Sequence, residues 1–99
     1  MAQVIWRLDD MLELQSIADF IARDSPTNAE KVVGRILAST RRLREFPQSG
    51  RKIPEASDES VRQVVARNYR VFYRLEKDAV VVIGERHGAM GLKFEDFPA

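Results

Sequence analysis

Residues 61–87 read VRQVVARNYRVFYRLEKDAVVVIGERH, a stretch rich in the β-branched and aromatic residues that favour strands. Two short breaks, Arg67-Asn68 and Lys77-Asp78, divide it into three runs. Each break is short enough for a tight hairpin and offers an Asn or Asp that tolerates a left-handed backbone. The stretch therefore predicts an antiparallel meander of three strands, and we expect the rest of the chain to cover it.

The middle run of the meander alternates with the period of two that a strand requires. One face would carry Tyr69, Val71, Tyr73 and Leu75, and the other would carry Arg70, Phe72 and Arg74. We expect the first face to pack on helices, with its tyrosines in the core, and the second to present cations. The third run, residues 79–84, is apolar at nearly every position, which predicts a central strand.

Before the meander, the sequence predicts a strand and a first helix. Residues 3–8 alternate in hydropathy and should form a strand that joins the same sheet. Asp9 and Asp10 are candidate caps for a helix over about residues 10–22. The side chains that we expect in the core are Trp6 and the helical stripe of Met11, Leu14, Ile17, Ala18 and Ile21.

A second helix should span residues 26–45, because Ser25 can cap it and Pro26 fits its first turn. The side chains expected to face inward are Ala29, Val32, Val33, Ile36, Leu37, Thr40 and Leu43. The connection between the two helices is short, which favours an antiparallel helical hairpin.

The segment after the second helix predicts a loop. Pro47 cannot continue a helix, and Gly50 is free to turn. Residues 52–60, KIPEASDES, are polar and show no periodicity, so we expect them on the surface. The whole chain, residues 1–99, is therefore expected to be a single α+β domain. It would consist of an N-terminal strand, an antiparallel helical hairpin and a three-stranded antiparallel meander, forming one sheet packed on the helices.

The composition restricts the possible chemistry. The chain has no cysteine and one histidine, which excludes disulfides and leaves no ordinary zinc site, so we expect no metal and no cofactor. The first residues, MAQVIWRL, do not resemble a signal peptide, and no apolar run approaches the roughly 20 residues of a membrane span. We therefore expect a cytoplasmic protein that does not contact membranes.

A net charge of +1 conceals a strong segregation of charge along the chain. Residues 1–34 carry a balance of −3, residues 35–74 carry +6 and residues 75–99 carry −2. A middle segment this basic can bind phosphate or an acidic protein partner, although a solvated helix face explains its helical arginines equally well.

Several short motifs occur in one order over nearly the whole chain. They are Trp6 before the first helix with Phe20-Ile21-Ala22, then Asp24-Ser25-Pro26, Phe46-Pro47 with Gly50-Arg51 and Pro54-Glu55, Asn68-Tyr69-Arg70-Val71 with Tyr73, and Arg86-His87-Gly88. In this order they resemble the RelE/ParE family of type II toxin–antitoxin toxins, and in particular its ParE-like, plasmid-stabilisation branch.

The resemblance to the ParE-like branch implies a toxin that inhibits DNA gyrase by binding and that a cognate antitoxin neutralises. Direct binding of the toxin alone to DNA is not implied. The chain departs from many relatives at Ala89-Met90, where a further arginine is usual, and at Gln63, where glutamate follows the arginine. It also lacks the lysine-rich strand of the ribosome-dependent mRNA cleavers. These departures favour a binding inhibitor over a nuclease.

The alternative is a RelE-like, ribosome-dependent mRNA endoribonuclease. RNA cleavage through the 2′-hydroxyl needs an acid or base and cations around the phosphate, roles that His87, Arg70 and Arg86 would take. The simpler reading of the same residues is a histidine that ends a strand and a solvated strand face.

The residues expected to bind the target are Arg51, Arg62, Arg70, Arg74, Arg86, Leu92, Phe94 and Phe97. For the antitoxin, the sequence offers the groove of the helical hairpin, the edge of the meander and the apolar tail, residues 92–99, as docking surfaces.

Overall fold

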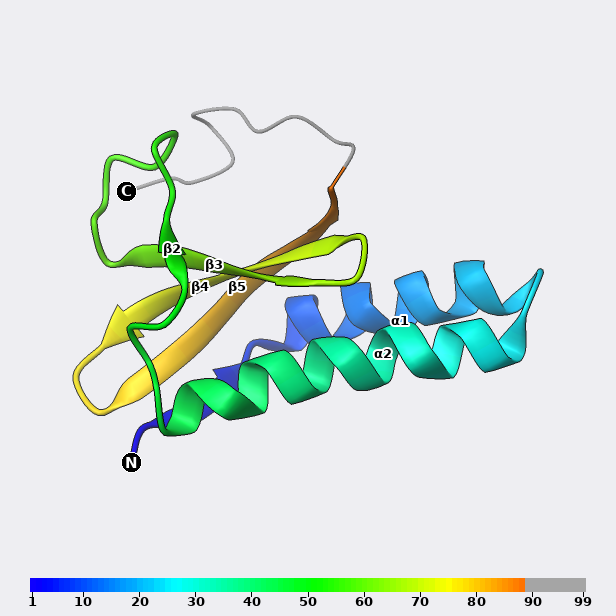
Figure 1. Cartoon of the computed structure of the whole chain (residues 1–99), viewed down its shortest axis with the longest axis horizontal. Coiled ribbons are helices and arrows are strands. Elements are labelled where there is room, and N and C mark those ends of the chain that lie inside the picture. Colours follow the sequence, from blue (N-terminus) through cyan, green and yellow to red (C-terminus); the bar gives the residue numbers. More distant parts are fainter. Residues whose placement is uncertain (89–99) are drawn as a thin grey trace.

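The computed structural model describes residues 1–88, which form a five-stranded sheet with two helices against one of its faces (Figure 1). The elements in chain order are β1 (Gln3–Trp6), α1 (Leu8–Ala22), α2 (Pro26–Arg41), a 3-10 turn (Arg42–Arg44), β2 (Arg51–Lys52), β3 (Val61–Ala66), β4 (Tyr69–Glu76) and β5 (Ala79–His87). The strand order is β1-β5-β4-β3-β2. The predicted α+β class, with a helical hairpin packed on one sheet, is confirmed.

The predicted meander is present as β3, β4 and β5, and β1 joins it in parallel to β5, with Val4 opposite Val80. The two hairpin turns have left-handed residues, with φ of 54° at Arg67 and 63° at Asp78. In the first turn, Arg67 adopts the left-handed conformation that was expected of Asn68. The carbonyl of Asn68 instead accepts a hydrogen bond from the Gly88 N–H at 2.6 Å, which ties this turn to the end of β5.

The prediction of a surface loop over residues 52–60 is wrong at its start. Lys52 belongs to β2, which pairs antiparallel with β3. Ile53 is only 3% exposed and packs against Val61 and Phe72 on the sheet face away from the helices. That face therefore carries a second small core as well as cations, because Ile53 and Phe72 remove each other's apolar surface from water.

The ends of the helices follow local chemistry that the sequence predicted only in part. Ser25 Oγ accepts a hydrogen bond from the Asn28 N–H at 3.1 Å, so the predicted cap of α2 is confirmed. The predicted caps of α1 are wrong, since Arg7 holds the capping position without a side-chain bond. Asp9 and Asp10 lie in the first turn, where a carboxylate is favoured by the free N–H groups of the helix. The helix α2 ends at Arg41, and the 3-10 turn continues it.

The main core lies between the helices and the sheet. Its buried residues are Val32, Ile36, Leu43, Ala66, Val71, Tyr73, Val80 and Val82, with Trp6, Leu14, Ile21 and Tyr69 packed against them. Met11 and Leu37 were expected to face inward, but they are 55% and 37% exposed. The sheet can cover only one side of a two-helix layer, so the opposite side keeps apolar residues at its surface.

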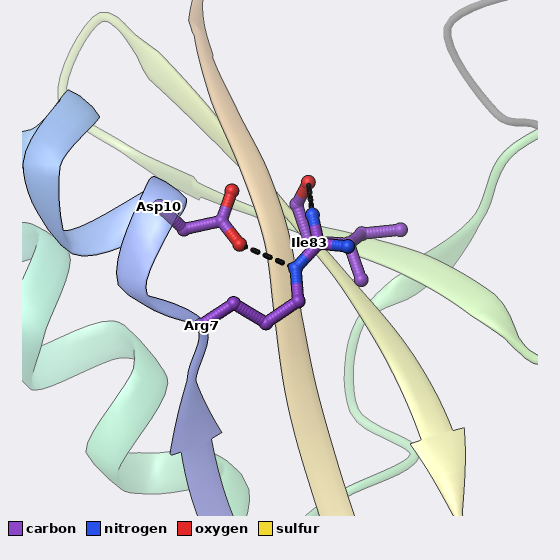
Figure 2. A network of polar contacts seen from close by, with 3 residues as sticks. All are labelled: Arg7, Asp10 and Ile83. Carbon is purple, nitrogen blue, oxygen red and sulfur yellow. Dashed lines mark hydrogen bonds and ion pairs between the residues drawn. The ribbon is translucent and has the colours of Figure 1, made fainter.

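A bulge in β5 fixes how this strand meets α1. Phe72 lies opposite Gly84 and Tyr73 lies opposite Val82, so Ile83 has no partner residue in β4. Arg7 donates from Nη2 to the Ile83 carbonyl and from Nε to Asp10 Oδ2, both at 2.7 Å (Figure 2). One guanidinium thus joins the first turn of α1 to the bulge.

Candidate functional site

Four arginines project from the sheet face away from the helices, which we call the outer sheet face. Arg70 lies directly opposite Arg86 across β4 and β5, Arg74 follows on the same face of β4, and Arg51 lies opposite Gln63 at the β2 edge. Residues directly opposite each other in an antiparallel pair share a face. These four predicted target-binding residues are therefore brought together on one surface.

Two arginines of the outer sheet face, Arg70 and Arg74, are held by neighbouring side chains. Arg70 donates from Nε to Gln63 Oε1 at 2.7 Å, and its guanidinium lies 5.4 Å from the centre of the Phe72 ring. Arg74 Nε lies 3.5 Å from Asp58 Oδ2. Asp58 in turn accepts hydrogen bonds from Ser60, which lowers the pKa of the Asp58 carboxyl. The loop before β3 thus orders one end of this surface.

Arg62 was predicted to bind the target, but the structure places it on the opposite face of the sheet. It lies across from Tyr73, and its Nη1 donates to the carbonyls of Gln48 and Gly50 at 3.1 and 2.9 Å. This side chain fastens the loop before β2 to β3.

Tyr73 holds the same loop from inside the core. Its hydroxyl accepts a hydrogen bond from the Gly50 N–H and donates one to the Pro47 carbonyl, both at 2.9 Å. Burial raises the pKa of Tyr73, so the hydroxyl keeps the proton that it donates. The expectation that Tyr73 packs in the core is confirmed. The Phe46-Pro47 and Gly50-Arg51 motif is thus fixed by a side chain from β4.

The three residues of the nuclease alternative do not lie on one face. His87 lies opposite Tyr69, and the two rings make an edge-to-face contact with centres 5.3 Å apart. Tyr69 packs on the helix side of the sheet. Arg70 and Arg86 project from the outer sheet face. The candidate acid or base is therefore on the opposite side of the sheet from the two candidate charge stabilisers.

A buried carboxyl group lies where β5 passes beneath α1. Glu85 is 2% exposed, and neither of its carboxyl oxygens has a hydrogen-bond partner among residues 1–88. Burial and, to a smaller extent, the negative charges of Glu13 and Asp10 together raise the pKa of Glu85 to about 8, with Arg7 acting in the opposite direction. Glu85 is thus protonated at neutral pH.

The helical hairpin carries exposed apolar side chains, most of them on α1. Leu8, Met11, Leu12 and Phe20 are exposed along α1. Between α1 and α2 lies a depression of about 250 Å³, which we call the hairpin groove. Its lining residues are Trp6, Met11, Leu14, Gln15, Ala18, Val33 and Leu37. Exposed apolar surface of this kind marks sites of protein association.

Other predicted features are outside these surfaces. Leu92, Phe94 and Phe97 lie outside the residues that the structure describes. Within residues 1–88, no helix has the length and hydropathy to cross a membrane, and no group of three or more His, Asp or Glu side chains is placed to hold a metal ion.

Sequence reasoning missed two features of the site. The acid at Glu85 was not noticed, because the bulge at Ile83 changes which side chains share a face, and a bulge leaves no reliable mark in a single sequence. The contacts of Gly50 were also missed, although the Gly50-Arg51 motif was singled out. Their signal was the combination of that motif with Tyr73, which only the fold brings together.

Three comparisons place the chain among known proteins. The family model described as the ParE toxin of the type II toxin–antitoxin system parDE matches residues 4–91. Toxin RelE2 of Caulobacter vibrioides is 30% identical over 89 residues, which cover 90% of this chain and 98% of that protein. The putative toxin Y4kP of Sinorhizobium fredii is 30% identical over 82 residues, which cover 81% of this chain and 82% of that protein. A chain of the solved chromosomal ParDE TA system from P. aeruginosa shares the fold, with a TM-score of 0.71 at 18% identity, over 88% of this chain and 96% of that chain.

Proposed function

This chain belongs to the ParE toxin family of type II toxin–antitoxin systems, and on that premise we propose that it inhibits DNA gyrase by binding and is neutralised by a cognate antitoxin. The outer sheet face, with Arg51, Arg70, Arg74 and Arg86, is the proposed target interface. The hairpin groove is the proposed antitoxin interface.

The observation that carries a binding function is the division of the candidate catalytic set between two faces. Cleavage of RNA requires the acid or base and the charge stabilisers to surround a single phosphate. His87 contacts Tyr69 on the helix side, whereas Arg70 and Arg86 project from the outer sheet face. Within residues 1–88, His87 is thus not beside Arg70 and Arg86, an arrangement better suited to bind a partner than to cleave RNA.

The proposal is tested with the purified full-length chain and two assays run in parallel. Supercoiling by purified gyrase should fall as the chain is added, and the same preparation should leave messenger RNA intact on translating ribosomes. Addition of the protein encoded beside the toxin gene should restore supercoiling. Site-specific cuts in ribosome-bound mRNA, with gyrase unaffected, would replace this proposal by the nuclease alternative.

Reversal of one charge on the outer sheet face is expected to weaken target binding. Arg70→Glu should raise the concentration needed for half-inhibition of gyrase by about tenfold, because the interface loses a cation and gains a repelling anion. Arg44→Glu makes the same change on the exposed 3-10 turn and should leave inhibition unchanged. Melting curves check that both variants remain folded. Equal inhibition by the two variants would remove the outer sheet face from the proposal.

A charge placed in the hairpin groove is expected to weaken antitoxin binding. Met11→Glu puts a carboxylate into the apolar lining at a position that is already exposed, so folding should tolerate it. An apolar partner segment would have to desolvate that charge, which predicts a loss of affinity of about tenfold or more. Phe46→Glu, at another exposed apolar position outside the groove, is the control. Titration calorimetry with the antitoxin measures both, and an unchanged affinity for Met11→Glu would contradict this site.

A further inference from the structure

A second groove runs between α2 and the outer edge of β3, on the side where the sheet ends. We call it the β3-edge groove, and its volume is about 880 Å³. Its lining residues are Arg35, Ala38 and Ser39 from α2, Arg42 from the 3-10 turn, Ser49, Gly50 and Arg51 from the loop and β2, and residues 63–67 from β3 and its turn. Figure 1 shows the backbone elements that contribute this lining, α2, β2 and β3.

The β3 wall is a strand edge that is only partly paired. The two-residue strand β2 lies opposite Gln63 and Arg62, and no strand in residues 1–88 pairs with the outer edge of residues 64–66. Alternate backbone N–H and C=O groups of such an edge point outward, where an added strand can bond to them. Val65 is 64% exposed beside this edge, which is unusual for a valine within a sheet.

The charges of the groove all have one sign. Arg35, Arg42, Arg51 and Arg67 line it, and no Asp or Glu does. None of the four makes an ion pair with another residue of the described range, 1–88. Between Arg35 and Arg42, the small side chains of Ala38 and Ser39 leave room beside β3. The groove therefore combines a strand edge that is open for pairing with positive charges that no ion pair neutralises.

The two helix-side arginines of the groove are spaced along the edge of β3. Arg35 in α2 and Arg42 in the 3-10 turn that continues it are seven residues apart, which is about 10 Å along the helix axis. Side chains on one face of an extended strand recur about every 7 Å, so two acidic side chains on the face toward α2 can each meet one of these long arginines. In a strand added to β3, every second side chain would point to α2, and the others would lie beside Val65 on the outer face.

We propose that the β3-edge groove binds an extended segment of a protein partner in which acidic and apolar residues alternate. The segment extends the sheet by pairing with residues 64–66 of β3. Its acidic side chains meet Arg35 and Arg42, and its apolar side chains cover Val65. A nucleic acid would satisfy the arginines but could not pair with the strand edge or cover the valine. This site is separate from the hairpin groove and shares only Arg51 with the proposed target interface on the outer sheet face.

The test uses the full-length chain and a fluorescein-labelled peptide with the sequence Glu-Val-Glu-Val-Glu-Val. Fluorescence anisotropy should show saturable binding, with no binding of Lys-Val-Lys-Val-Lys-Val. A peptide of the same composition in two blocks, Glu-Glu-Glu-Val-Val-Val, should bind at least about tenfold more weakly, because the strand would present only part of its charge to α2. Two methylated forms of the peptide are compared, one at the odd-numbered and one at the even-numbered backbone nitrogens. One form should lose binding and the other should keep it, because only one set of N–H groups faces β3.

Two matched double variants locate the site. Arg35→Glu with Arg42→Glu should abolish binding, whereas Lys31→Glu with Arg41→Glu reverses two charges on the same helix outside the groove and should leave it unchanged. Similar affinities for both variants would overturn the proposal. It would equally be overturned if the block peptide or a single-stranded oligonucleotide of equal charge bound as tightly as the alternating peptide, because the groove would then be a simple anion surface.

Discussion

Gly50→Ala is expected to lower the free energy of unfolding by about 3 kcal/mol, which is a large part of the stability of a small domain. A Cβ at position 50 would overlap the Tyr73 hydroxyl and approach the Gln63 carbonyl oxygen to 2.6 Å and Tyr73 Cε1 to 2.8 Å. The Gln63 oxygen belongs to the β3 backbone and cannot move aside. Relief would require the loop to leave the sheet, with the loss of both hydrogen bonds of the Tyr73 hydroxyl.

Thermal unfolding measures this effect, since about 1 kcal/mol shifts the Tm of a domain of this size by roughly 4–8 °C. Gly34→Ala is the matched control, because nothing lies within 4 Å of its new methyl group. That substitution should raise stability by up to about 1 kcal/mol through helix propensity. Gly50→Ala combined with Tyr73→Phe should recover only part of the loss, because the clash with the Gln63 oxygen remains. A Gly50→Ala variant with the same Tm as the wild type would refute the close packing of this loop.

Stability is expected to fall as pH rises from about 4.5 to about 8, because of Glu85. Its pKa is about 8 in the folded chain, against an ordinary value of 4.5, so folding takes up a proton over this interval. The contribution of Glu85 to the free energy of unfolding is fully present below its pKa in the unfolded chain, and it is lost as pH rises through its pKa in the folded chain. At about 1.4 kcal/mol for each pKa unit, the limit is roughly 5 kcal/mol. The charged groups that face Glu85 are Glu13 and Asp10 from α1 and Arg7 before it.

Urea unfolding at pH values from about 4 to about 9, an interval that spans both pKa values of Glu85, measures this dependence. Glu85→Gln removes the titrating group and should flatten the decline, so that the variant gains on the wild type toward alkaline pH. Glu76→Gln removes an exposed carboxyl at the end of β4 and should keep the wild-type slope. A decline that persists unchanged in Glu85→Gln would show that another group causes it.

The sequence predicted the fold where periodicity and turn chemistry act locally. The alternation in residues 69–75 and the cap at Ser25 both reappear in the structure. Prediction from the sequence failed where a contact joins distant segments of the chain. Ile53 looked like part of a polar loop, because its burial depends on Phe72, which β4 brings to it from far along the chain.

The candidate site shows the same division. The arginines of β4 and β5 could be listed from the sequence, and strand alternation could separate Arg86 from His87. Which side of the sheet each of these two residues occupies could not be predicted, because it depends on the bulge at Ile83. The β3-edge groove was missed because Arg35 and Arg42 look like a solvated helix face until the unpaired edge of β3 is seen beside them.

The parallel pairing of β1 with β5 determines when this toxin can become complete during its own synthesis. Gln3–Trp6 lie beside residues 79–82, so β1 leaves the ribosome well before β5 and has no partner strand until β5 follows. At synthesis rates of about 5–20 residues per second, β1 waits several seconds with its edges open. Its pairing also spans most of the chain, a contact of the kind that slows folding. A ribosome that stops before β5 therefore releases a fragment with an incomplete sheet, and only translation to the end of this strand produces the folded toxin.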